Sequence, residues 1–370
     1  MDTLTHALSG ALLARATARA GEAPRPLARR IAGGFLACAA PDLDFVAGFF
    51  GPVAYLENHR GVTHSLVLLP LWALALSWAL AAILREPRGW RALYGVCALG
   101  IGLHVAGDVI TSYGTMVLAP LSDWRAGIGT TFIIDLWFTG IIVAGLGASA
   151  LLRQDRRPAI VACVALVAYV GFQYALKREA LEFGERYARE HGARGAVIAA
   201  EPRPVSPFNW TVFVSDAEAH RFAHVNLVRE RPLEAGPDAG FIRKLDAVYA
   251  PLQGARWETR TRYGDAAIEP LAREAWESPA MAVYRWFAAE PAFDGVTRGS
   301  VCVWFVDLRF LTPVYPGDEL TVTLTCKEII SREDAGHGEV RWDADVTNQD
   351  GKSVATYDVL TLVAKEWPPA

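Results

Sequence analysis

The sequence predicts an α-helical multi-pass membrane domain followed by a soluble α+β domain with an antiparallel C-terminal sheet. The composition changes along the 370 residues: the chain is apolar up to about Leu176, and beyond Lys177 it is rich in charge, Pro and Trp. Residues 66–84 run for 19 positions without a charge, which is long enough to cross a bilayer. Short runs of alternating apolar residues from Phe208 onward are typical of strands. We therefore expect three domains, at residues 1–176, 177–310 and 311–370.

Four apolar segments of the N-terminal domain are predicted to span the membrane. They are residues 66–84, 94–113, 132–152 and 159–176. Two further apolar stretches, residues 4–18 and 31–50, are too short or too interrupted for a span of this kind. We expect re-entrant or half-buried helices in these two stretches.

Arginine counts predict the orientation of the segments. Residues 15–30 hold five arginines, and residues 85–91 and 153–157 hold three each. Short loops rich in Lys and Arg stay on the cytoplasmic side of a membrane. The loop at residues 113–131 and everything after Lys177 are then expected on the outer side. The polar residues of the apolar segments fall near this same outer face.

The strongest chemical signal is a set of histidines and aspartates inside or beside the apolar segments. Four of the eight histidines lie within the first 108 residues. Ionisable groups at membrane depth are costly and mark functional sites. His104 and Asp108 are spaced HxxxD, which places them on one helix face as two ligands of one metal, or as a ligand and its orienting partner. The alternative for this pair is a hydrogen bond between helices.

Two further motifs carry ligands of the same kind. In HRGVTHS, His59 and His64 flank a glycine-containing turn, and Arg60 can stabilise negative charge on a phosphoryl group. The alternative is an ordinary polar loop at a helix start. In PDLD, Asp42 and Asp44 lie two residues apart, which suits two carboxylate ligands, or one ligand and one general base. A helix N-cap with a neighbouring turn aspartate is the other interpretation of PDLD.

Together these residues predict a divalent metal centre with nitrogen and oxygen ligands, Zn²⁺ by its ligand preference and Mn²⁺ as the second choice. The predicted ligands are His6, Asp44, His59, His64, His104, Asp108 and Asp135. The predicted catalytic residues are Asp42 and Arg60. No CxxC motif occurs, which argues against a thiolate zinc site. A net charge of −4 without a basic stripe argues against a nucleic-acid partner.

The order of these motifs resembles a known family. MDxLTHALSG, PDLD, HRGxTHS and HxxxDxxTSYG follow one another as in the YdjM family, described as LexA-binding, inner-membrane-associated, metal-dependent hydrolases. The resemblance extends over about residues 1–310, through IIDLWFT, SPFNW and VWFVDLRF. It implies a set of metal residues made of His6, Asp42, Asp44, His59, His64, His104 and Asp108, with Asp135 as an addition. The order is also similar to that of the zinc-dependent phospholipase C and single-strand nuclease superfamily, which implies phosphodiester chemistry by analogy.

The C-terminal residues depart from that family. FLTPVYPGDELTVTLTCKEII and VTNQDGKSVATYDVLTLVAK resemble the second half of a MaoC-like hotdog domain, without the Asp and His pair of its first half. We expect residues 311–370 to form antiparallel strands without hydratase activity, which pair with the upstream sheet that ends in VCVWFVDLRF. Residues 348–351, NQDG, predict a hairpin turn. Cys302 and Cys326 lie on candidate strands, and their pairing is left open.

The sequence thus predicts a membrane-bound, metal-dependent hydrolase of phosphodiester or ester bonds in a membrane-borne substrate. The lipid bilayer is its expected surroundings. A second copy of the chain is one candidate to cover the apolar face of the C-terminal strands. The alternative is a non-enzymatic membrane protein with a structural metal or hydrogen-bond cluster and a partner-binding soluble domain. A structural centre is closed by four protein ligands, whereas a catalytic centre keeps a position for water.

Overall fold

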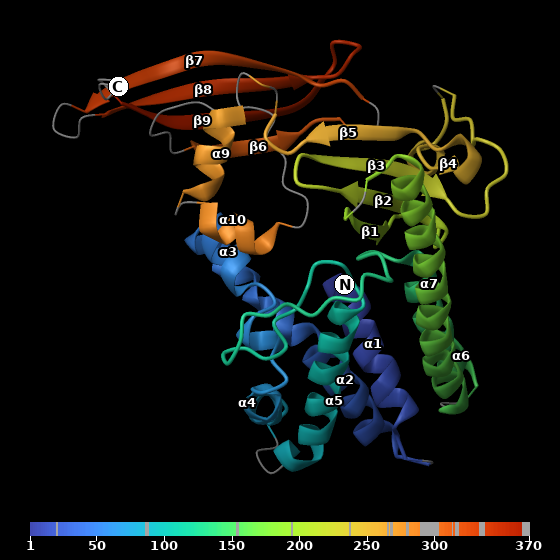
Figure 1. Ribbon diagram of the computed structural model, residues 1–370. Coiled ribbons are helices and arrows are strands. Elements are labelled where there is room, and N and C mark those ends of the chain that lie inside the picture. Colours follow the sequence, from blue (N-terminus) through green and yellow to red (C-terminus); the bar gives the residue numbers. More distant parts are fainter. Residues whose placement is uncertain are drawn as a thin grey trace. The chain divides into compact units, whose positions relative to one another are not determined.

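The computed structural model describes the chain except residues 20, 86–88, 153–154, 194, 237, 265, 267–268, 279–280, 289–302, 313, 315–317, 333–336 and 365–370. The chain forms two compact units (Figure 1). The first comprises Met1–Pro232, Tyr249–Arg260 and Pro279–Pro291. The second comprises Leu233–Val248, Thr261–Ser278 and Ala292–Ala370.

Helices make up the N-terminal part of the first unit. In chain order they are α1 (Thr3–Ala16), α2 (Pro24–Ala39), the 3-10 helix η1 (Ala40–Phe50), α3 (Pro52–Asn58), η2 (Val62–His64), α4 (Leu69–Ile83), α5 (Trp90–Val109), α6 (Leu136–Leu151) and α7 (Arg157–Glu190). Their starts follow ordinary capping chemistry: Asp2 caps α1 through the amide of Thr5, and α2, α4 and α7 each carry a proline in the first turn.

Glycines allow α1, α2 and α5 to pack at close distance. A Cβ added at Gly10 of α1 would lie 2.1 Å from the carbonyl oxygen of Gly34 of α2. A Cβ at Gly100 of α5 would lie 2.9 Å from the Ala37 Cβ and 3.2 Å from the Cys38 nitrogen. Small residues at helix contacts are the usual means by which membrane helices approach each other. The approach brings the polar residues of the three helices within reach of one another.

Three helical stretches of the described chain are long and apolar enough to cross a membrane, or four if one bent pair counts as a span. The three are Pro24–Phe50, Trp90–Val109 and Arg157–Glu190. The bent pair joins Val53–His64 to Leu69–Ile83 at 82°, so the span predicted at residues 66–84 is shorter and is preceded by a sharp break. The segment predicted at 132–152 becomes α6, an apolar helix of 16 residues.

The expectation for residues 31–50 was wrong in length. Pro24–Phe50 forms a helical stretch of 27 residues and is a candidate span. The arginines at positions 25, 29 and 30 interrupt the apolar run in the sequence, but in the structure they occupy the first turns of α2, at the end of the span. Charged residues at the end of a membrane helix are tolerated because their side chains reach the interface.

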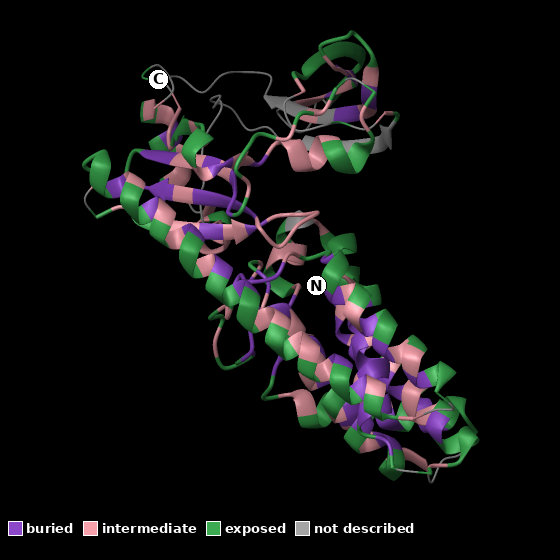
Figure 2. Ribbon diagram, turned by 90° about the vertical axis from the view of Figure 1, so that its right-hand side faces the viewer, coloured by how far each residue is buried: buried purple, intermediate pink, exposed green. Residues whose placement is uncertain are grey.

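The outer faces of these helices are apolar. Figure 2 shows buried residues inside the helical part and exposed residues along its outside. Several of the exposed side chains are large and apolar, among them Leu71, Trp78, Val164 and Val167. Contiguous apolar surface of this kind is rare on water-soluble monomers and is expected where a helix faces lipid.

A five-stranded sheet completes the first unit. It contains β1 (Val197–Pro202), β2 (Asn209–Ser215), β3 (Ala219–Asn226), the short β4 (Ala250–Pro251) and β5 (Trp257–Thr261), with order β1-β2-β3-β4 and β5 paired to β3. The α7 helix passes through the domain boundary predicted at residue 176 and packs on this sheet. Leu176 and Ala180 lie in one core with Trp210 and Val212. The short helix α10 (Ala282–Phe287) also belongs to this unit.

The second unit contains a four-stranded antiparallel sheet and the helices α8 (Phe241–Ala247) and α9 (Glu269–Glu277). Its strands are β6 (Val303–Phe310), β7 (Thr321–Arg332), β8 (His337–Thr347) and β9 (Ser353–Ala364), in the order β6-β9-β8-β7. The C-terminal strands pair with VWFVDLRF as predicted, because β6 pairs with β9, but the upstream strands β1 to β5 form a separate sheet.

The turn predicted at NQDG is confirmed between β8 and β9, where Gly351 has a φ of 72°. Cys326 is a free thiol, and Cys302 lies outside the described residues. The apolar residues Leu320, Val322 and Leu324 are about half exposed, so the face that they form stays open to solvent in the described structure.

Candidate metal centre

The HxxxD pair of α5 provides the first two donors. His104 and Asp108 are both fully buried and lie one helical turn apart. The Nδ1 atom of His104 lies 2.6 Å from the carbonyl oxygen of Cys38. A carbonyl can only accept, so Nδ1 carries the proton and donates it, and Nε2 is left with its lone pair. This lone pair points toward Asp108 Oδ2, 3.4 Å away.

His64 presents a second lone pair to the same point. Its Nδ1 lies 2.9 Å from Thr63 Oγ1 and 3.3 Å from Asp44 Oδ2, and both can accept its proton. Its Nε2 lies 2.9 Å from His104 Nε2 and 3.2 Å from Asp108 Oδ2. If each Nδ1 holds the proton, two nitrogen lone pairs face one another without a hydrogen between them. That arrangement is repulsive unless a cation lies between the rings.

Asp108 is the carboxylate that His6, His64 and His104 all contact. Its Oδ1 lies 3.0 Å from His6 Nε2, 3.1 Å from Arg60 Nη2 and 2.5 Å from the amino nitrogen of Met1. Its Oδ2 is buried and has no hydrogen-bond partner among the residues that the structure describes. A buried carboxylate oxygen without a donor is costly, which points to a cation as the missing partner.

His6 and Asp42 complete the group from two other elements. The His6 ring stacks on the His104 ring with centroids 3.7 Å apart. Gly107 permits this position, since a Cβ there would lie 3.0 Å from His6 Cε1. Asp42 places Oδ1 3.5 Å from His104 Nε2, while its Oδ2 accepts a hydrogen bond of 2.6 Å from Thr3. One donor atom from each of His6, Asp42, His104 and Asp108 lies within 4.8 Å of the other three.

The separations fit a divalent cation. Donors bound at about 2.1 Å in a tetrahedral arrangement lie about 3.4 Å from one another. Around His64 Nε2, the other donors lie at 2.9 Å on His104, 3.2 Å on Asp108 and 3.9 Å on Asp42. Imidazole nitrogens and carboxylate oxygens are the ligands that zinc and manganese share. The residues present therefore suit the predicted metal, and several of them are fixed by hydrogen bonds on the side away from it.

Asp44 and His59 surround the group rather than belong to it. The Oδ1 atom of Asp44 lies 2.8 Å from His59 Nδ1, and its Oδ2 accepts from the Arg60 amide at 2.8 Å and from Thr63 at 3.0 Å. With the contact to His64, Asp44 orients the whole HRGVTHS turn. A carboxylate that holds a ligating imidazole in place is a common outer partner of zinc sites.

Arg60 is buried between the centre and the following loop. Its φ of 59° is a left-handed conformation that arginine rarely adopts. The hydrogen bond from its backbone amide to Asp44 holds it in this conformation. Its guanidinium contacts Asp108, donates to Thr111 at 2.9 Å and lies 4.7 Å from the centre of the Tyr113 ring. Its Nε has no hydrogen-bond partner in the described structure.

Asp135 lies at the N-cap of α6. Its Oδ1 accepts from the amides of Trp137 and Phe138 at 2.9 Å, and its Oδ2 accepts from Gln173 at 2.8 Å and from the Tyr169 hydroxyl at 3.0 Å. Both oxygens are therefore occupied by protein donors. Its predicted role as a ligand stays a prediction, and its contacts favour capping of the helix.

A cavity of about 430 Å³ lies beside Arg60 and is lined in part by Thr111, Tyr113 and Phe287. Arg125 lies beside it, with its guanidinium carbon 4.9 Å from the centre of the Tyr113 ring and 4.8 Å from that of Phe287. Burial lowers the pKa of Arg125 and raises the pKa of Tyr113, which stays a neutral phenol at physiological pH. Arg125 could not be predicted from the sequence, because it lies in a loop without a motif.

Comparison with known proteins agrees with the N-terminal motifs. Residues 1–180 match the family described as YdjM inner membrane protein. The resemblance predicted over residues 1–310 is thus matched up to residue 180, and the hotdog resemblance of the C-terminal strands stays a prediction. The chain is 26% identical over 175 residues to "Uncharacterized protein YfhP" of Bacillus subtilis (strain 168), which covers 46% of this chain and 52% of that protein. The chain spans about half the length of this curated relative, and no solved structure matches.

Proposed function

We propose that residues 1–180, which match the family described as YdjM inner membrane protein, form a membrane-embedded, metal-dependent hydrolase. One observation carries this proposal. Two imidazole lone pairs and a buried carboxylate oxygen without a donor converge on one point between η2 and α5. With the proton of each imidazole on Nδ1, these three atoms have no proton to share, so a cation is the partner that suits them.

The residues divide into ligands and chemical groups. His64, His104 and Asp108 would hold the cation and leave a fourth position for water, and His6 would orient Asp108 through its Oδ1. Zn²⁺ is favoured by the imidazoles, and Mn²⁺ is the second choice. A divalent cation bound there supplies a Lewis acid and lowers the pKa of water. Asp42 is the least buried carboxylate of the group, and one of its oxygens is fixed by Thr3. We assign Asp42 as the general base that takes a proton from the attacking water, or as a further ligand.

Arg60 and its neighbours favour a phosphoryl substrate. The guanidinium lies between Asp108 and the Tyr113 ring, and its Nε is unpartnered. The guanidinium of Arg125 also lies over the Tyr113 ring. Two arginines near one metal are suited to the negative charge that grows on a phosphoryl group during hydrolysis. We therefore favour a phosphodiester over a carboxylic ester.

The substrate is proposed to be membrane-borne because the centre lies among helices with apolar outer faces. The loop at residues 113–131 and the sheet that follows α7 are proposed to lie on the periplasmic side, as the arginine-rich loops at the other helix ends predict. A lipid phosphodiester would reach the centre from the adjoining leaflet.

A structural metal centre is the second candidate, and the burial of the ligands favours it. His6, His64, His104 and Asp108 are at most 1% exposed. Four protein ligands around one ion would leave no position for water, and the soluble sheets would then serve to bind a partner. A coordination measurement by X-ray absorption spectroscopy separates the two: an oxygen ligand beyond the protein's own indicates an open, catalytic position.

The test uses the full chain, purified in detergent, with metal content measured by mass spectrometry and hydrolysis measured on bis(p-nitrophenyl) phosphate and on a p-nitrophenyl ester. We expect about one transition-metal ion per chain, and loss of both metal and hydrolysis in His104→Gln and Asp108→Asn. His191→Gln is the matched control, because His191 is exposed and outside the centre. A metal-free wild-type protein whose stability does not respond to chelator would refute the proposal. Metal without hydrolysis would favour the structural alternative.

A further inference from the structure

A second cavity lies at the opposite end of α5 from the metal centre. It has a volume of about 600 Å³. Leu93 and Val96, in the first turns of α5, line it, whereas His104 lies 11 residues beyond Leu93. At 1.5 Å per residue this separation is about 16 Å along the helix. The cavity is therefore distinct from the hydrolytic centre, and nothing in the proposed reaction uses it.

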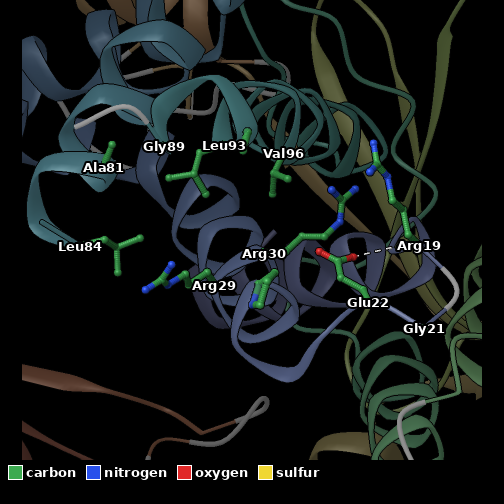
Figure 3. A pocket seen from close by; sticks show the side chains of 12 residues that line it. Arg19, Gly21, Glu22, Arg29, Arg30, Ala81, Leu84, Gly89, Leu93 and Val96 are labelled. Carbon is green, nitrogen blue, oxygen red and sulfur yellow. Dashed lines mark hydrogen bonds between the residues drawn. The ribbon is translucent and has the colours of Figure 1, made fainter. Parts of the chain in front are cut away.

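The cavity has a charged side and an apolar side. Arg19 and Glu22 approach from the turn between α1 and α2, and Arg29 and Arg30 approach from α2. Leu84 and Leu93 contribute apolar surface from the ends of α4 and α5. In the view of Figure 3, Arg19, Glu22 and Arg30 lie toward one end of the cavity, and Leu84 lies toward the other end with Arg29 beside it. Three arginines against one glutamate leave a formal excess of two positive charges (3 − 1 = 2).

The arginines differ in how they are held. Arg30 donates from Nε to the Ala14 carbonyl at 3.0 Å and from Nη2 to the Thr17 hydroxyl at 2.9 Å, which fixes its guanidinium against the end of α1. Glu22 is occupied by the Arg19 backbone amide at 3.1 Å. The Arg19 guanidinium has no ion pair with the residues that the structure describes. A guanidinium held by the helix end and an exposed one in the same cavity suit an anion that arrives from outside.

The volume decides against a small anion alone. A cavity of this size holds about twenty waters at about 30 Å³ each, several times the volume of a phosphate ion. A phosphate on the arginines would leave the leucine side filled with water. A ligand with both a phosphate and an apolar part fills the two sides together, and cavities of this volume are typical for ligands of that size.

We propose that this cavity binds the head group of an anionic phospholipid, with its phosphate on the arginines and the start of its acyl chains against Leu84 and Leu93. The loops that form the cavity are the arginine-rich ones, which the positive-inside rule places at the cytoplasmic leaflet. Basic pockets between membrane helices at that leaflet are suited to acidic head groups. The inference rests on the proposed membrane placement and is independent of the metal chemistry.

The experiment measures lipid retention by native mass spectrometry of the full chain in detergent, with phosphatidylglycerol, phosphatidylcholine and inorganic phosphate as probes. Wild-type protein should retain phosphatidylglycerol at least about tenfold more tightly than phosphatidylcholine, as expected for charge-assisted contacts. The double variant Arg19→Gln/Arg29→Gln should lose that preference. Arg25→Gln is the control, since Arg25 is exposed in the same segment and does not line the cavity.

A variant of the apolar side separates a lipid from a free anion. Leu84→Gln should weaken the retention of phosphatidylglycerol and leave the binding of inorganic phosphate unchanged. If inorganic phosphate displaces phosphatidylglycerol at equal concentration, the cavity is a site for soluble anions and the lipid proposal is wrong. Equal retention of the two lipids, or full retention in the double variant, would also overturn it. Metal content measured on the same samples tells these outcomes apart from a failure of the hydrolytic centre.

Discussion

The two ends of the helical part differ in how tightly they define a ligand. At the metal end, the imidazoles are buried, and hydrogen bonds to Cys38 and Asp44 set the protonation and direction of His104 and His64. At the arginine end, a cavity of about 600 Å³ is lined by charged side chains, among which Arg30 is held by Ala14 and Thr17 and Arg19 is exposed. The same helix, α5, supplies residues to both.

This difference shows two ways in which one bundle can select a ligand. A metal ion whose bonds to its ligands are about 2 Å long is selected by the distances between the ligand atoms. These atoms must therefore be in position before the ion binds. A lipid head group is recognised by charge and by a boundary between polar and apolar walls, which tolerates movement of the arginines. The metal end should therefore respond strongly to small geometric changes, and the arginine end should respond mainly to changes of charge.

Removal of the metal should produce the largest effect. Chelation leaves two facing lone pairs and a carboxylate oxygen without a donor buried in the bundle, and the folded state loses the free energy of metal binding. A ligand at 1,000 times its dissociation constant contributes about 4 kcal/mol to folding. We expect the thermal unfolding midpoint of the detergent-solubilised chain to fall by several degrees in chelator and to recover with added Zn²⁺. The Arg19→Gln/Arg29→Gln variant should show the same fall, and a smaller fall in that variant would contradict the independence of the two ends.

Helix spacing gives the second largest effect. Gly100→Ala adds a Cβ at 2.9 Å from Ala37 and 3.2 Å from the Cys38 nitrogen, which pushes α5 away from α2 and loosens the bond between His104 and the Cys38 carbonyl. Loss of such an orienting bond typically weakens metal binding by about 10–100-fold. Gly95→Ala, on the same helix with no atom within 4 Å of the added Cβ, should leave the affinity unchanged. Competition with a fluorescent zinc chelator measures both, and equal affinities would show that the spacing is not critical.

Local patterns explain what the sequence could predict of this site. The i, i+4 spacing of His104 and Asp108 fixes their common face in any helix, and the glycine-containing HRGVTHS fixes a turn. The partner of His104 is a backbone carbonyl 66 positions away, which no residue pattern records. Asp42 and Asp44 are equivalent in the PDLD pattern. Only the fold places Asp44 beside Nδ1 of His64 and turns Asp42 toward Nε2 of His104.

The positions of the helices could be predicted where apolar segments alternate with polar ones. The bends between helices could be predicted less well. Residues 94–113 and 159–176 lie largely on α5 and α7 as expected. The 82° break before α4 follows from the polar HRGVTHS turn and its contacts to Asp44, which are tertiary. The strand pairing of β6 with β9 was anticipated because unpaired apolar strands need a neighbour, although the position of the sheet relative to the first unit does not follow from that rule.

A smaller effect is expected at Asp44. Asp44→Asn keeps an oxygen that can accept from the Arg60 amide, but it removes the negative charge that orients His59 and His64. We expect about a tenfold loss of zinc affinity, at the lower end of the range for an orienting carboxylate. The same competition assay measures it. Asp123→Asn, an exposed loop aspartate, is the control, and an unchanged affinity in Asp44→Asn would mean that Thr63 alone holds His64.

The smallest effect is expected at an exposed carboxylate, Asp216, in the turn between β2 and β3. The hydrogen bond from Arg221, at 2.6 Å, and the amides of Glu218 and Ala219 lower the pKa of Asp216 from 3.8 to about 2. Because the folded pKa is depressed, the stabilisation is present above pH 3.8 and is lost as the pH falls through about 2. The pair is partly exposed and solvent screens it, so its contribution is at most about 1 kcal/mol.

Asp216→Asn therefore should lower the free energy of unfolding by less than about 1 kcal/mol at pH 7, and the difference from wild type should shrink as the pH is lowered from 4 toward 2. Denaturant unfolding of the two proteins at pH 7 and pH 3 measures this difference. Metal content should be equal in both. Asp108→Asn, by contrast, removes the carboxylate that solvent does not reach and should lose the metal at every pH. A loss at Asp216 as large as the loss at Asp108 would show that burial is not what separates these two carboxylates.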